Sequence, residues 1–231
     1  MKKIILFLLA SMFLCVPFQS RSQEDYNPVA PNYKLIKKNI AKANGLYYYP
    51  TLKQRFLAGD TTLLLEQLRH LYYGEVFQPG YSGYSKNGES KIHNILKQDS
   101  LLDSDWQRIV AIADSNLPQV PTSMRLYYYK WMAQAALHGE QSPEARQVQW
   151  QLSSIVDVLF SSGNGMTFEM AVHVTNVSHE YVFMNIMGFQ STGQSLQYHK
   201  KQAYDVMKVA ENEFMLKELY FNADQILKHG F

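Results

Sequence analysis

The hydrophobic residues between positions 33 and 160 recur every three or four residues, and Gly, Pro, Asn and Asp interrupt them at intervals. Apolar residues at this spacing share one face of a helix, and Gly or Pro ends the run. The pattern therefore predicts helices over about 35–43, 51–58, 63–74, 92–96, 101–117, 122–138 and 143–160.

Residues that cap helices strengthen three of these predictions. Ser142-Pro143 places a capping residue before a Pro at the first helical position. Ser100, with Asp103 three residues later, predicts a capping box, and Thr61-Thr62 predicts a cap for the third helix. Between these helices, the stretch from 106 to 139 resembles a tetratricopeptide-type repeat. It matches one repeat length without a recurrence at 34 residues, so the resemblance implies a pair of antiparallel helices and no array.

The periodicity changes after Gly163. Residues 168–174 alternate between apolar and polar, and 181–187 is apolar and β-prone, which together predict a hairpin. Two further strands are expected at 204–209 and 214–221, with one long helix over 198–227 as the alternative. We therefore predict an α+β fold in which N-terminal antiparallel helical hairpins pack with a small C-terminal antiparallel β-sheet.

The first 22 residues have the layout of a signal peptide. Two lysines precede an apolar run that ends at Val16, and Ser20 and Ser22 stand at the small-residue positions before Gln23. The run is shorter than the roughly 20 residues needed to span a bilayer. We expect cleavage before Gln23 and export to the periplasm or the extracellular space, with no membrane span afterwards. A lipoprotein attached at Cys15 is not expected, because bulky residues precede that cysteine.

Cleavage would also change the chemistry of the chain. Cys15 is the only cysteine, so the mature domain would have neither disulfides nor thiol chemistry. Basic residues would fall from 22 to 19 against 20 acidic residues, because the leader carries three of the basic residues and none of the acidic ones. A nearly neutral domain lacks the basic surplus of a nucleic-acid binder. We expect residues 23–32 to form an extended lead-in and 33–231 to form one domain, helical over 33–162 and β-rich over 166–222.

The third predicted helix carries a set of polar residues that we call the α-helical seam. Glu66, Arg69, His70 and Tyr73 are three, four and seven positions apart, so they line one face. Such a seam fits a binding site for an anion or a carbonyl group, and it equally fits a buried structural network. If it is structural, replacing Arg69 with Ala should unfold the protein. If it is functional, the fold should survive while ligand binding is lost.

The sequence contains two further candidate sites, which are weaker than the seam. His173, His179 and Glu180 are weak candidates for a two-histidine, one-carboxylate metal site. Their spacing fits no metal-binding signature, so two surface histidines near a loop are the favoured interpretation and no metal is expected. Tyr81 and Tyr84 belong to a long Gly- and Pro-containing loop at 78–90 and could offer rings to a sugar or a partner. No motif that binds a nucleotide cofactor is present, so no cofactor is expected.

One family resemblance covers most of the mature chain. The segment from Asp60-Thr61-Thr62 to the RHLYYG run at 69–74 resembles an exported Bacteroidetes family known only as a domain of unknown function. The resemblance implies export and a single α+β unit but no activity. The leading hypothesis is a non-catalytic binding or interaction protein in the cell envelope, with a protein or small ligand as its partner. A hydrolase using the seam or the His173/His179 metal site, and a carbohydrate-binding accessory protein, are the alternatives.

Overall fold

The computed structural model describes residues 27–84 and 88–230. The predicted signal peptide, Cys15 and the cleavage site before Gln23 therefore lie outside the described residues. In the part that is described, no helix is long and apolar enough to cross a membrane.

The helical half of the chain follows the hydrophobic periodicity closely. Each predicted helix up to residue 160 is present with its ends shifted by a few residues. The helices are α2 Tyr33–Ile40, α3 Tyr49–Leu57, α4 Leu65–Gly74, α5 Glu89–Leu96, α6 Asp103–Asn116, α7 Met124–His138 and α8 Pro143–Phe160, with a short 3-10 turn η2 at Glu75–Phe77.

The helix caps agree with the sequence in one case and differ in two. Ser142 caps α8 as predicted, since its hydroxyl accepts the backbone N–H of Ala145 at 3.2 Å. The box expected from Ser100 lies two residues later, where the Asp105 carboxylate accepts the N–H of Leu102 at 3.0 Å. Thr62 does not cap α4, because its hydroxyl donates to Asp60 at 2.6 Å.

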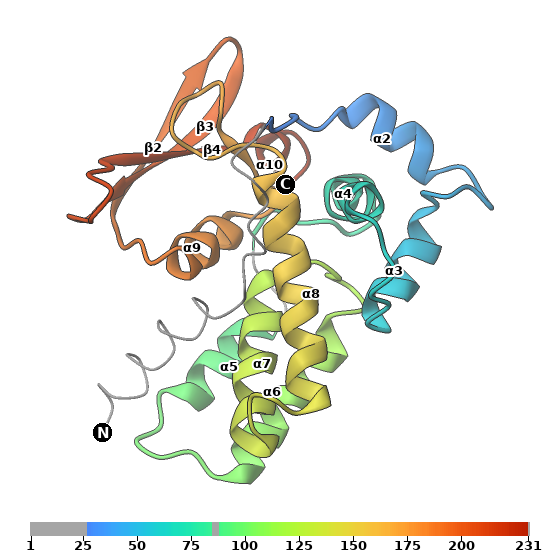
Figure 1. The fold of residues 1–231 in the computed structure, drawn as a ribbon, viewed down its shortest axis with the longest axis vertical. Coiled ribbons are helices and arrows are strands. Elements are labelled where there is room, and N and C mark those ends of the chain that lie inside the picture. The colour runs from blue at the N-terminus through green and yellow to red at the C-terminus, as the bar shows by residue number, and fades with distance from the viewer. Residues whose placement is uncertain (1–26, 85–87, 231) are drawn as a thin grey trace.

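Helix α4 lies at the centre of the helical layer (Figure 1), in contact with α2, α3 and α8. Tyr72 and Tyr73 of this helix are buried, with exposures of 1% and 0%. The predicted pair of helices between 106 and 139 is also present, since α6 packs on α7, which packs in turn on α8. The core therefore runs through α4, α7 and α8.

The C-terminal part forms a four-stranded sheet, which confirms the α+β class. Its strands are β1 Val172–His173, β2 Ser191–His199, β3 Gln202–Val209 and β4 Glu218–Asn222, in the order β1-β4-β3-β2. Strand β1 pairs with β4 in parallel, whereas the other pairs are antiparallel, so the sheet is mixed rather than wholly antiparallel as predicted. The long-helix alternative for 198–227 is wrong, because β3 and β4 lie inside that range and the only helix there, α10, begins at Asp224 and ends at His229.

The predicted hairpin between 168–174 and 181–187 is wrong. Only two residues of its first half form a strand, and its second half lies in helix α9, Val177–Ile186. Asn176, between the two halves of the predicted hairpin, caps this helix with its side chain. The ring of Phe183 packs edge-on against Phe221 of β4 at 5.9 Å. Burial of apolar residues against the sheet thus outweighs their β propensity.

Strand β2 was not predicted at all. It is the edge strand of the sheet and is exposed along most of its length, so it lacks the alternation of a half-buried strand. It turns into β3 through Lys200 and Lys201, whose φ angles are +47° and +66°. Two positive φ values are typical of a tight hairpin turn, which usually carries Asn or Gly. The Lys-Lys pair gives no such signal.

Candidate functional site

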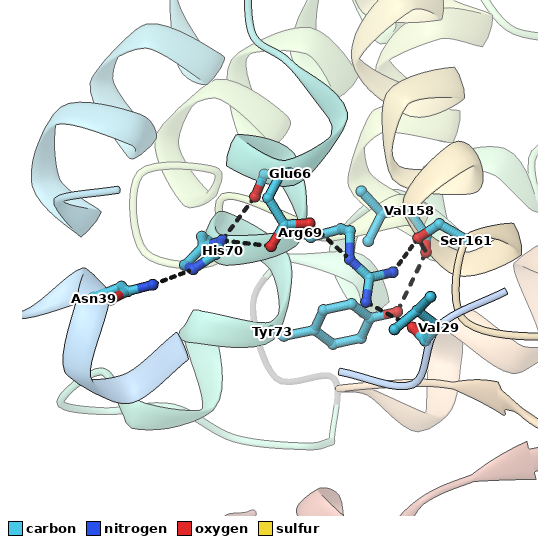
Figure 2. A network of polar contacts seen from close by, with 8 residues as sticks. All are labelled: Val29, Asn39, Glu66, Arg69, His70, Tyr73, Val158 and Ser161. Atoms are coloured by element: carbon cyan, nitrogen blue, oxygen red, sulfur yellow. Dashed lines mark hydrogen bonds and ion pairs between the residues drawn. The ribbon is translucent and has the colours of Figure 1, made fainter. Parts of the chain in front are cut away.

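The predicted seam on α4 is assembled as a buried network (Figure 2). Arg69 is 7% exposed, and its Nε lies 3.3 Å from the Glu66 carboxylate. Its two other nitrogens donate to the Val29 carbonyl, at 2.7 Å, and to the Ser161 hydroxyl. The Val29 N–H also donates to the Ser161 carbonyl at 2.9 Å. Arg69 therefore ties the chain before α2 to the end of α8.

His70 has a partner at each ring nitrogen. Asn39 Nδ2 donates to Nε2 at 3.0 Å, so Nε2 is the acceptor and the proton lies on Nδ1. Nδ1 then donates to the Glu66 carbonyl at 2.8 Å. The imidazole also stacks on Tyr47, with ring centroids 3.9 Å apart. These contacts hold the ring in one tautomer and one orientation.

Tyr73 completes the seam from inside the core. Its hydroxyl donates to the Val158 carbonyl at 3.3 Å, and its ring lies 5.5 Å from the Arg69 guanidinium. The sequence thus correctly placed the four seam residues on one face. Three of them are buried with partners inside the protein, as expected for a structural network, while Glu66 is exposed.

The two loop tyrosines do not form a paired platform. The Tyr81 hydroxyl donates to the Thr175 carbonyl at 2.5 Å, and burial raises its pKa well above the ordinary value. Tyr84 is 37% exposed. The Val177 N–H donates to the Gly83 carbonyl at 3.0 Å, so the described part of this loop is docked against the start of α9.

The predicted metal ligands lie in different environments. His179 is buried, with Tyr72 Oη 2.8 Å from its Nδ1, and desolvation lowers its pKa to about 3. Glu180 is fully buried, and desolvation followed by the nearby Asp205 raises its pKa. Across residues 27–84 and 88–230, no three His, Cys, Asp or Glu side chains come together as a metal site.

The structure contains a polar cleft that was not predicted from the sequence. It has a volume of about 280 Å³ and lies between the lead-in, the start of α2 and one end of the sheet. Four segments far apart in the sequence contribute to it, around 30–33, 168–173, 199–204 and 222–225. Among its lining residues are Glu169, His173, His199, Lys200, Gln202 and Asp224.

Each carboxylate that lines this cleft has a lysine partner. Glu169 accepts from Lys200 at 2.9 Å and lies 3.2 Å from His199, and these contacts, led by the Lys200 hydrogen bond, lower its pKa to about 2. Asp224 accepts from Lys228 at 2.5 Å. The cleft is thus polar without an unbalanced carboxylate.

His173 is the exception within the cleft. Its backbone N–H donates to Ser162 at 2.9 Å, but its buried ring Nδ1 has no hydrogen-bond partner among the described residues. Burial, with the positive charge of Arg69, lowers its pKa to about 4. The ring is therefore neutral near pH 7 and offers one donor and one acceptor.

The seam and the cleft are structurally connected. Arg69 holds Val29, and the next two residues, Ala30 and Pro31, line the cleft. Asn32 then caps α2 by accepting the N–H of Leu35 at 3.0 Å. Arg69 thus acts on the cleft by positioning one of its walls. In the sequence, His173 is only a weak candidate for a metal ligand, and the other walls of the cleft give no signal because none of them forms a local motif.

Comparison with known proteins gives one match. A family model described as a domain of unknown function, DUF4919, matches residues 34–230. No curated protein and no solved structure shows significant similarity to the chain.

Proposed function

The chain belongs to the DUF4919 family, a domain of unknown function, and we propose that it is an exported, non-catalytic protein that binds a small polar ligand in the cleft. The proposal rests chiefly on His173. This imidazole lines the cleft, and its buried Nδ1 has no partner among the described residues. Buried polar groups are normally hydrogen-bonded, so an unpaired one beside a polar cleft favours a ligand-binding role.

A binding role is favoured over the hydrolase alternative by the state of the candidate catalytic groups. Arg69, His70 and Tyr73 form their hydrogen bonds within the protein. His173 has a pKa of about 4, whereas an efficient general base has a pKa near the working pH. These residues therefore fit positioning and hydrogen bonding better than proton transfer.

Ligand binding is testable by thermal shift with a panel of small polar compounds: sugars, amino acids, carboxylic acids and phosphates. A ligand that binds only the folded state stabilises it by about 1.4 kcal/mol at ten times its Kd. We expect at least one compound to raise the melting temperature of the native chain and not that of His173→Phe. If no compound does so, or if both proteins respond equally, the binding proposal is wrong.

Export is supported by the charge and hydropathy layout of residues 1–22. The test is to express the full chain in its native cell, fractionate the cell and determine the N-terminus by mass spectrometry. We expect an envelope or secreted protein that begins at Gln23. A cytoplasmic protein that retains residues 1–22 would contradict export and leave the cleft proposal intact.

A further inference from the structure

The charges of the cleft constrain the charge of its ligand. The charge of Glu169 is balanced by Lys200, and the charge of Asp224 is balanced by Lys228. A ligand with a net charge would have to compete with one of these ion pairs for its counter-charge. The pairing thus favours a neutral ligand.

The neutral side chains of the cleft offer both hydrogen-bond donors and acceptors. Gln202 Oε1 accepts from the Tyr204 hydroxyl at 2.9 Å and from Asn222 Nδ2 at 3.3 Å. These two donors fix the orientation of the amide, and its Nε2 makes no hydrogen bond to the described residues, so it is an available donor. Gln225 Nε2 donates to Asp224 at 3.3 Å, which leaves its Oε1 as an available acceptor.

A hydroxyl group matches this arrangement, because it donates one hydrogen bond and accepts others. The neutral His173 adds one further donor and one acceptor. The aromatic rings of Tyr33, Phe168 and Tyr204 add apolar area to the same walls. The volume of about 280 Å³ is close to the lower end of the range typical of ligand pockets, which suits one ring-sized molecule.

We propose that the cleft binds a neutral polyhydroxylated molecule of the size of a single sugar unit, recognised by Gln202, Gln225 and His173. This inference rests on the proposed function, because it names the ligand class of the same cleft. The tyrosine platform at Tyr81 and Tyr84 has no part in it.

The test compares neutral and charged versions of the same scaffolds. Glucose, galactose and myo-inositol are titrated against glucuronate, glucosamine and glucose 6-phosphate, using calorimetry and amide chemical shifts of the full mature chain. We expect a neutral compound to shift the amides around His173 and Gln202 and to bind at least about tenfold more tightly than its charged counterpart.

The variant Gln202→Glu tests the recognition. It keeps an acceptor for Tyr204 and Asn222 but replaces the Nε2 donor with a carboxylate oxygen, so affinity for the neutral compound should fall at least about tenfold. Gln98→Glu makes the same change on the exposed turn after α5 and should leave the Kd unchanged. If Gln202→Glu fails to fold, as judged by circular dichroism, His173→Phe takes its place with the same expectation.

The outcomes separate this inference from the proposed function. Tighter binding of a charged compound at these amides would overturn the neutral class while supporting the cleft as a binding site. The same affinity for Gln202→Glu and the native chain would overturn the assigned recognition. If no compound of either panel shifts these amides, and the broader thermal-shift panel also fails, both proposals are wrong.

Discussion

His70 and His173 both lie near Arg69 and differ in what surrounds their rings. Both nitrogens of His70 have partners, and Tyr47 covers one ring face. His173 is close enough to Arg69 for the guanidinium to lower its pKa, yet its buried Nδ1 has no partner among the described residues. The completeness of hydrogen bonding, rather than residue type or burial, distinguishes the structural histidine from the candidate ligand-binding one.

The seam on α4 and the cleft differ in the same way: polar groups of the seam have partners within the protein, whereas several in the cleft do not. In the seam, the guanidinium and the imidazole are partnered by carbonyls, a hydroxyl, an amide and Glu66. In the cleft, the carboxylates are paired, but Gln202 Nε2, Gln225 Oε1 and the buried His173 Nδ1 have no hydrogen-bond partner among the described residues. We expect substitutions in the seam to alter stability and substitutions in the cleft to alter binding.

The largest effect is expected for Arg69→Ala. The substitution removes donors to the Val29 carbonyl and the Ser161 hydroxyl, together with the ion pair to Glu66. The free energy of unfolding, measured by urea denaturation, should fall by about 4 kcal/mol, because hydrogen bonds from a buried charged group are among the strongest. Arg108→Ala, at an exposed position of α6, should change it by less than about 0.5 kcal/mol. A loss below about 1 kcal/mol for Arg69→Ala would contradict a structural role.

The second prediction concerns Glu75, a buried acid directly after α4 whose pKa is strongly raised. Burial raises its pKa from 4.5 to about 7, although a hydrogen bond from Thr122 opposes the shift. The folded state therefore holds a proton that the unfolded state has lost between these pH values, and stability falls as pH rises through this window. Relative to the native chain, Glu75→Gln should gain about 3 kcal/mol between pH 4.5 and 7.

Denaturation curves at several pH values give this difference directly, because the other titrating groups cancel between the two proteins. Glu211→Gln, at an exposed position before β4, is the matched control and should show no such trend. Parallel stability profiles for Glu75→Gln and the native chain would mean that Glu75 is ionised in the folded state at lower pH than expected.

The third prediction concerns the loss of stability when His70, whose two ring nitrogens both have partners, is replaced. His70→Phe preserves the stacking surface for Tyr47 but removes the side-chain hydrogen bonds to Asn39 and to the Glu66 carbonyl. We expect a loss of about 2 kcal/mol in urea denaturation, because unpaired buried polar groups carry a desolvation penalty. A loss under about 0.5 kcal/mol would show that water replaces the imidazole at no cost, and the contrast with His173 would disappear.

Local signals explain how much of this architecture could be predicted from the sequence. The helices up to residue 160 follow from apolar spacing with Gly and Pro interruptions, and the seam follows from offsets within one helix. The contacts that give the seam its role come from Val29 and Ser161, which lie 40 and 92 residues away from Arg69. No local pattern indicates such partners.

The C-terminal half shows where local patterns mislead. Residues 181–187 are β-prone but lie mainly in α9, because packing of that helix on the sheet buries them. Strand β2 is polar and turns through Lys200 and Lys201, so it lacks both strand alternation and a turn signal. The cleft is lined by His199 and Lys200 at the end of β2, so its site could not be predicted without the sheet that assembles it.

The smallest stability effect at neutral pH is expected for His173→Phe. The phenyl ring has nearly the shape of the imidazole and removes an unpartnered buried nitrogen, so unfolding free energy at pH 7 should change by less than about 1 kcal/mol.

In the native chain, the folded pKa of about 4 lies below the ordinary 6.5, so the unfolded state binds the extra proton between these values. Native stability is then lost as pH falls from 6.5 to 4, whereas His173→Phe lacks this contribution and should become the more stable protein in acid. Urea denaturation of both proteins at pH 7 and pH 4.5 measures the difference. A loss at pH 7 as large as that of His70→Phe would mean that His173 is structural too, and the cleft would lose its main candidate for ligand recognition.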